Sequence, residues 1–108
     1  MASYVTLPSK DYQTIIPWVV DCSSQLYDGE TVTSAIVTSA VFAGVDSAPE
    51  DMITTDAEIE GNIVTQYVEG GEEGVTYLLS LDICTSLTNV LKVYAYLSVL
   101  NETPMVAL

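Results

Sequence analysis

The clearest hydrophobic pattern runs through residues 64–100 and predicts three successive β-strands joined by two turns. In residues 75–83 every odd position is large and apolar, whereas the even positions carry Thr76, Ser80 and Asp82, with Leu78 as the exception. Residues 91–99 repeat this alternation. A period of two gives a pleated strand one buried face and one wetter face. Three glycines in residues 69–74 mark a turn between the first two strands, so we expect a hydrophobic hairpin here.

Shorter apolar runs predict further strands in the first part of the chain. These are residues 15–21, 31–39, 41–45 and 63–68, with a short strand near 52–55 and either a strand start or one helical turn at 57–62. Pro17 cannot donate a ladder hydrogen bond, which suggests an edge strand or a bulge. Asp28-Gly29 is a strong turn signal. No segment shows sustained helical periodicity, so we expect no more than a turn or two of helix.

Seven or so short strands separated by turns indicate an all-β fold, an antiparallel immunoglobulin-like β-sandwich of about seven strands. The sandwich domain is expected to cover residues 11–100. Residues 1–10 are predicted to form an N-terminal docking segment that needs a neighbour to order it, and residues 101–108 form a C-terminal tail.

The two cysteines, Cys22 and Cys84, are spaced like an immunoglobulin inter-sheet disulfide. The other marks of that pattern are missing, because Trp18 precedes the first cysteine and Asp82 stands where a tyrosine would be expected. We therefore expect two buried thiols in a reducing compartment, with a disulfide as the alternative.

The charge of the chain is strongly one-sided. Two basic residues stand against 15 acidic ones, which gives a formal net charge of −13. Such a surface repels nucleic acid and anionic membranes and suits a partner with a basic patch. No stretch is apolar for long enough to span a bilayer, and the start lacks the pattern of a secretory signal. We expect a soluble protein that is used without export.

Catalytic chemistry finds little support in the sequence. There is no histidine, and only Lys10 and Lys92 could serve as an amine base or nucleophile. Paired carboxylates could hydrolyse glycosides, but the acidic residues fall in turns and on wet strand faces. The acidic loops at 46–51 and 69–73 lack the spacing of a known calcium motif. We predict no catalytic residue, no cofactor and no metal site.

Exposed apolar side chains are the better candidates for function. Tyr94 and Tyr96 share the wetter face of the last strand with Lys92, where they either form a partner-binding patch or are covered by the second sheet or a loop. Both ends of the chain are too apolar to be left simply in water. The predicted partner-binding residues are Tyr4, Val5, Leu7, Tyr94, Tyr96, Met105, Val106 and Leu108.

Several motifs resemble those of a known family. Residues 26–34 read Leu-x-Asp-Gly-Glu-Thr-Val-x-Ser, residues 64–77 read Val-x-x-Tyr-Val-Glu-Gly-Gly-x-x-Gly-Val-Thr-Tyr, and Thr-Ser follows the next strand at 85–86. This order resembles the small β-sandwich structural proteins of tailed bacteriophages, whose pattern is a "dGdtI.S" turn and strand, a "v.lsGGt.Gt.Y.v" hairpin and a "Ts.Gr" turn. The chain departs from it in the first strand and at the last turn, where residues 86–89 lack the Gly-Arg pair.

The resemblance implies a non-enzymatic virion protein that is assembled in the bacterial host cytoplasm. Members are fibre-tail adaptors or related virion accessory proteins, and no catalytic residues come with the family. We expect an adaptor that links tail or neck to fibres and binds other virion proteins, with copies of itself arranged around a symmetry axis. A capsid cement or decoration protein is the alternative within this class, and a carbohydrate-binding module is the alternative from another class.

Overall fold

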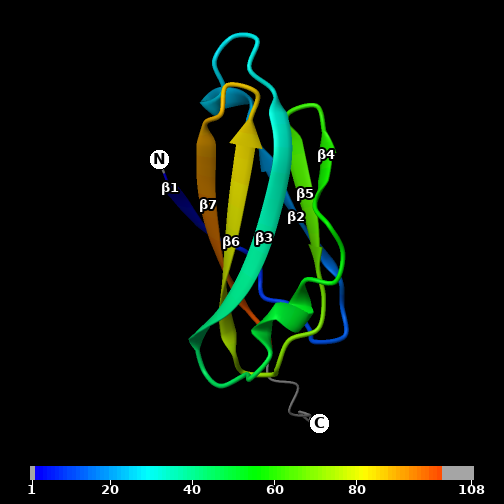
Figure 1. The fold of residues 1–108 in the computed structure, drawn as a ribbon. Coiled ribbons are helices and arrows are strands. Elements are labelled where there is room, and N and C mark those ends of the chain that lie inside the picture. Colours follow the sequence, from blue (N-terminus) through cyan, green and yellow to red (C-terminus); the bar gives the residue numbers. More distant parts are fainter. Residues whose placement is uncertain (1, 101–108) are drawn as a thin grey trace.

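The computed structural model describes residues 2–100, which form seven β-strands in two sheets. The strands are β1 (Ala2–Thr6), β2 (Ile16–Asp21), β3 (Val32–Ala43), β4 (Glu58–Glu60), β5 (Ile63–Val68), β6 (Thr76–Thr85) and β7 (Val90–Ser98). One sheet has the strand order β1-β7-β6-β3 and the other the order β2-β5-β4 (Figure 1). Two single-turn 3₁₀ helices, η1 (Ser23–Gln25) and η2 (Pro49–Met52), complete the elements. The predicted all-β class is confirmed.

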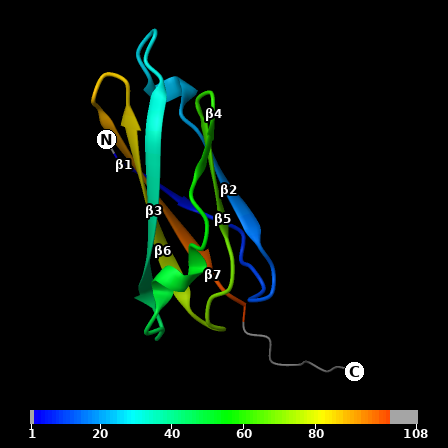
Figure 2. The same ribbon diagram turned by 45° about the vertical axis from the view of Figure 1, so that its right-hand side comes forward.

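The hydrophobic core lies between the two sheets, which face each other in Figure 2. Along β6 the odd positions are buried and the even positions are half-buried, as the alternation predicts. Tyr77 and Leu79 from this strand pack in one core cluster with Trp18 of β2 and Val64 of β5. Because alternate residues of a strand point to opposite faces, one face of each sheet supplies the core and the other is left to solvent.

The connection between β5 and β6 differs from the predicted hairpin. β5 belongs to the three-stranded sheet and β6 to the four-stranded sheet, so the glycine-rich loop crosses from one sheet to the other. The hairpin that does form joins β6 to β7, whose pairing runs from Thr76 opposite Ser98 to Cys84 opposite Val90. Turn residues such as glycine permit either connection, and the packing of the two sheets decides between them.

Two of the shorter predicted strands are also corrected. Residues 41–45 are not a separate strand, because β3 continues to Ala43 with irregularities in its pairing at both ends. The strand predicted near residues 52–55 is instead η2 and the loop after it. Pro49 starts η2, where its fixed φ suits a helical turn, and Met52 is buried at 1% exposure beneath the crossover. Of the two alternatives for residues 57–62, the strand is correct, because they contain β4. The edge position predicted from Pro17 is also confirmed, because β2 is an outer strand of its sheet.

The N-terminal segment finds its ordering neighbour within the same chain. β1 pairs with β7, and this pair is parallel, whereas the other strand pairs of residues 2–100 are antiparallel. The bridge between Lys10 and Val99 continues the contact. Lys10 is buried, its Nζ donates to the carbonyls of Asp11 and Gly70 at 2.7 Å each, and desolvation lowers its pKa. The predicted tail, residues 101–108, lies outside the described residues.

The two cysteines are free and lie on different sides of the four-stranded sheet. Cys22 is part of the core, and burial raises the pKa of its thiol. Cys84 occupies an outward position of β6. Within residues 2–100, no helix is long and apolar enough to cross a membrane.

Candidate functional site: an aromatic sheet face and an edge groove

The outer face of the four-stranded sheet carries a cluster of aromatic side chains. In the strand register Tyr4 of β1 lies beside Tyr94 of β7, and Tyr96 of β7 lies beside Leu78 of β6. Phe42, near the end of β3, reaches the ring of Tyr96. We call these five side chains and Ile36 of β3, which points outward opposite Asp82, the aromatic face.

The rings of the aromatic face hold one another in place. The rings of Tyr4 and Tyr94 are stacked with their centroids 4.7 Å apart and an interplanar angle of 18°. Tyr4 also lies 6.1 Å from Tyr96, and Phe42 meets Tyr96 edge-on at 4.9 Å. These are the separations and angles that aromatic pairs prefer. Stacked rings cover each other's faces, so the cluster is not the coplanar exposed row that a carbohydrate-binding module requires.

The aromatic face is partly exposed and carries no net charge, and its members Leu78, Tyr94 and Tyr96 are half-buried. Tyr4 and Phe42 are each 60% exposed and Ile36 is 67% exposed. The four strands of this sheet contain two charged residues, Asp82 and Lys92, which form an ion pair at 3.0 Å. The hydrogen bond and the charge of Asp82 raise the pKa of Lys92. On a chain with a net charge of −13, this face combines exposed aromatics with an absence of excess charge, which is typical of the centre of an interface.

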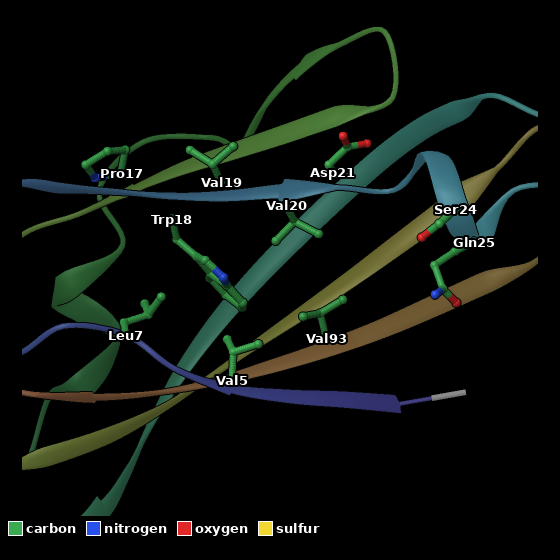
Figure 3. A pocket seen from close by; sticks show the side chains of 10 residues that line it. All are labelled: Val5, Leu7, Pro17, Trp18, Val19, Val20, Asp21, Ser24, Gln25 and Val93. Carbon is green, nitrogen blue, oxygen red and sulfur yellow. The ribbon is translucent and has the colours of Figure 1, made fainter.

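A second apolar surface opens between β1 and β2, at the edges of the two sheets. It is a groove of about 550 Å³ in which Val5, Leu7 and Val93 from one side face Trp18 and Val20 from the other (Figure 3). Pro17, Val19 and Asp21 of β2 also line the groove, with their side chains on the other side of the strand from Trp18 and Val20 (Figure 3). Ser24 and Gln25 of η1 line one end of the groove, so its lining is apolar along most of its length and polar at that end.

The predicted partner-binding residues divide between these two surfaces. Tyr4, Tyr94 and Tyr96 come together on the aromatic face, and the alternative that the second sheet covers the last two is wrong, because that sheet packs on the opposite side. Val5 and Leu7 line the groove instead. Met105, Val106 and Leu108 lie outside the described residues.

Sequence reasoning missed three members of the aromatic face, namely Ile36, Phe42 and Leu78. One signal was present, because Leu78 is the apolar exception among the even positions of its strand. The register places it between Tyr96 and Ala40 on the outer face, where an apolar residue completes the cluster.

One acidic side chain from each of the two acidic loops accepts hydrogen bonds within the fold. Asp46 accepts hydrogen bonds from the Tyr77 hydroxyl at 2.5 Å and from the backbone N–H of Ala48 at 2.9 Å. Glu69 accepts a hydrogen bond from the hydroxyl of Thr54. In residues 2–100, no group of three or more Cys, Asp or Glu side chains is placed to hold a metal ion.

The structure is an all-β protein of two sheets whose surface carries a neutral aromatic face and an apolar groove, the kind of surface that is enriched at protein interfaces. The comparison with family models gives the particular family: residues 10–97 match the model described as podophage GP4 fiber-tail adaptor protein gp77. The chain therefore belongs to this family of phage fibre-tail adaptors, which are structural components of the virion. The match starts after β1, so Tyr4 and Val5 precede it. A search of curated proteins gave no match.

Hydrogen bonds to Glu30, part of the Asp-Gly-Glu-Thr motif, connect the turn at residues 27–30 to the turn between β6 and β7. Glu30 is 4% exposed, and its carboxylate accepts hydrogen bonds from the Tyr27 N–H at 2.8 Å, the Asn89 amide at 2.9 Å and the Thr85 hydroxyl. The bond from Thr85 is the main cause of the lowered pKa of Glu30. The resemblance thus rests on residues that set the architecture.

The turn between β6 and β7, where the chain lacks the Gly-Arg pair of the family pattern, also differs in its backbone conformation. Thr88 stands where the motif has glycine, and at φ 63° it is the one non-glycine residue of positive φ in the described chain. Asn89 stands where the motif has arginine and still donates to Glu30. Asn89 thus keeps a hydrogen bond to the buried Glu30 carboxylate at the arginine position of the motif. Thr88, however, adopts a positive φ that the glycine of the motif would adopt without strain.

Replacing Thr88 by glycine is expected to raise the free energy of unfolding by about 0.5–1 kcal/mol, because glycine adopts a positive φ without steric cost and a β-branched residue does not. Thermal or urea unfolding measures the change. Leu87→Gly in the same turn is the control, since Leu87 has no positive φ to relieve and should gain nothing. Equal stabilisation by both substitutions would contradict the strain at Thr88.

Proposed function

We propose that this protein is a non-enzymatic virion adaptor that links the phage tail or neck to fibres. The observation that carries the proposal is the family match over residues 10–97, and the absence of histidine agrees with a role that involves binding alone. The proposal assigns the apolar side chains to partners: the groove and the segment 105–108 to other virion proteins, and the aromatic face to further protein contacts.

The occupant proposed for the groove is an extended segment of a tail or fibre protein. Among residues 2–100, β1 pairs with β7 alone and β2 with β5 alone, so each presents one backbone edge that no strand of this range covers. An unpaired edge accepts an added strand through main-chain hydrogen bonds, and adjacent apolar pockets select its side chains. Val5, 42% exposed above the nearly buried Trp18, is placed to receive an apolar side chain from such a segment.

The substitution Val5→Glu is expected to weaken binding to purified tail or fibre complexes at least tenfold, because it places a carboxylate where an apolar side chain is buried. Binding is measured by biolayer interferometry on isolated complexes. Val45→Glu is the matched control: Val45 is 87% exposed in the loop after β3 and is not among the residues that line the groove, so this variant should bind as the wild type does. If Val5→Glu binds the complexes as tightly as the wild type does, the groove is not the binding site.

The location in the particle tests the adaptor role itself. Labelled protein in intact virions, imaged by cryo-electron microscopy, is expected where tail and fibres meet. Density over the capsid lattice instead would overturn the adaptor role.

Deleting residues 105–108 is expected to reduce incorporation into particles while leaving the unfolding midpoint of the isolated protein unchanged, since these apolar residues are proposed to contact a neighbouring subunit. Quantitative immunoblots of purified particles measure the first effect, and thermal unfolding measures the second. Full incorporation of the truncated chain would contradict the assignment.

A further inference from the structure

We propose that the outer face of the three-stranded sheet docks a basic surface of another virion protein, one that presents arginine or lysine side chains around an apolar centre. The inference rests on the virion role proposed above, because it names the chemistry of a virion partner. We call this surface the acidic sheet face. Its members are the outward-pointing residues of β2, β4 and β5, namely Pro17, Val19, Asp21, Glu58, Glu60, Ile63, Thr65 and Tyr67.

The strand register places these side chains in rows across the sheet. Residues directly opposite each other in antiparallel strands point to the same face. Pro17 lies opposite Tyr67, and Ile63 lies between Asp21 on one side and Glu60 on the other. The intervening residues of β2 and β5 are buried or half-buried on the core side of the sheet. The acidic sheet face therefore looks away from the four-stranded sheet (Figure 2).

The centre of the acidic sheet face is apolar and exposed. Val19 of β2 is 57% exposed, and Ile63 and Tyr67 of β5 are each 41% exposed. The solvent face of an antiparallel sheet is ordinarily polar, because its strands alternate apolar residues inward with polar residues outward. Large apolar side chains at outward positions of two paired strands therefore indicate a surface that a partner covers, and tyrosine is among the residues enriched at such interfaces.

Exposed carboxylates border this apolar centre along β4 and at the end of β2. They belong to Asp21, Glu58 and Glu60. The chain has only two basic side chains, and both are engaged elsewhere. Lys10 is buried and donates to backbone carbonyls, and Lys92 forms its ion pair on the other sheet. Within residues 2–100, no lysine or arginine therefore pairs with these three carboxylates.

These unpaired charges select the chemistry of the partner. Glu58 and Glu60 stand about 7 Å apart along one strand, and Asp21 lies two strands from Glu60, about 10 Å away. An apolar partner surface would take water from these carboxylates and return nothing. A basic surface supplies counter-charges, since arginine binds a carboxylate through two N–H groups and stacks on an aromatic ring such as Tyr67. Nucleic acid and a second copy of this acidic chain are repelled.

Carboxyl footprinting of the free chain and of intact purified particles tests whether the face is covered. A carbodiimide with glycine ethyl ester converts accessible carboxylates to amides, and mass spectrometry measures the rate at each residue. Glu58 and Glu60 are expected to react roughly tenfold more slowly in particles, because a buried interface excludes the reagent. Equal rates in both samples would overturn the proposal. The result does not depend on which virion protein covers the face, so it separates failure of this inference from failure of the adaptor role.

Charge neutralisation tests the chemistry of the partner. The double substitution Glu58→Gln with Glu60→Gln is expected to weaken binding to isolated tail or fibre complexes roughly tenfold at about 50 mM NaCl, and the difference should shrink at about 500 mM NaCl because salt screens the charge pairs. Glu72→Gln with Glu73→Gln removes the same charge from the exposed β5–β6 loop and should bind as the wild type does. Equal weakening by both pairs would mean that net charge attracts the partner, and unchanged binding of the first pair would mean that the partner is not basic; either result overturns the proposal.

The apolar centre is tested by Tyr67→Ser, which should weaken binding roughly tenfold at both salt concentrations, because apolar burial is not screened. Tyr27→Ser, at an exposed position outside the acidic sheet face, is the matched control and should bind normally. Near-ultraviolet circular dichroism confirms that both variants are folded. Unchanged binding of the Tyr67 variant would refute the assignment of this face.

Discussion

The substitution Gly71→Ala is expected to lower the free energy of unfolding by about 3 kcal/mol. Gly71 lies in the crossover between β5 and β6 with φ 97°, where L-residues are strained by roughly 1–2 kcal/mol. A Cβ atom there would stand 2.7 Å from Cγ2 of Val99 and 3.2 Å from Cε of Met52. Both neighbours are buried, so the clash adds an overpacking cost of about 1–3 kcal/mol. Urea unfolding at neutral pH measures the difference.

The adjacent glycine provides the control for this prediction. Gly70 also has a positive φ, at 70°, but a Cβ atom built on it meets nothing within 4 Å. Gly70→Ala should therefore cost only the conformational strain, about 1 kcal/mol. If both substitutions cost the same, the close approach of Gly71 to Val99 is not what constrains the crossover.

The crossover also shows where prediction from the sequence reaches its limit. The strand at residues 63–68 was predicted with the bounds of β5, and alternation placed β6 and β7 to within two residues, because periodicity is a local property. The partner of each strand is not local. Glycines at 70, 71 and 74 permit a hairpin and a crossover equally, and only the fit of the loop over Met52 and Val99 makes it a crossover.

The candidate site was likewise predicted from the sequence only where it depends on local alternation and not where it depends on strand pairing. Alternation in β7 correctly placed Tyr94 and Tyr96 on the outer face. Tyr4 joins them through the parallel pairing of β1 with β7, which links residues about 90 positions apart and leaves no periodic signal. The same pairing sends Val5 to the other side, so neighbouring residues of one apolar segment lie on two different surfaces.

The charge of the chain is distributed unevenly over the fold. The acidic residues gather in loops and on the three-stranded sheet, as at Glu58 and Glu60 of β4, whereas the four-stranded sheet keeps a single balanced pair. The outer face of the four-stranded sheet therefore carries no excess charge.

The substitution Tyr77→Phe is expected to cost about 2 kcal/mol of unfolding free energy at neutral pH. The Tyr77 ring is fully buried, and its hydroxyl donates to Asp46 at 2.5 Å and accepts from the Glu72 N–H at 2.7 Å. Phenylalanine keeps the ring in the core but leaves a carboxylate and a backbone N–H without this partner, and unsatisfied groups of that kind cost about 1–3 kcal/mol. Tyr27→Phe, at an exposed position, is the control and should change stability by less than about 0.5 kcal/mol.

The pH dependence of the same variant tests the cause. Burial and the hydrogen bond to Asp46 raise the pKa of Tyr77 to about 12, so the fold favours the protonated phenol. A pKa raised by folding contributes stability that is complete below the unfolded value near 10 and is lost as pH rises through the folded value. The advantage of the wild type over Tyr77→Phe should therefore shrink between pH 10 and 12 in urea titrations, while the advantage over Gly71→Ala stays constant. If the wild type is still more stable than Tyr77→Phe by the same amount at pH 12, the hydrogen bond that the Tyr77 hydroxyl donates to Asp46 is not the cause of the difference.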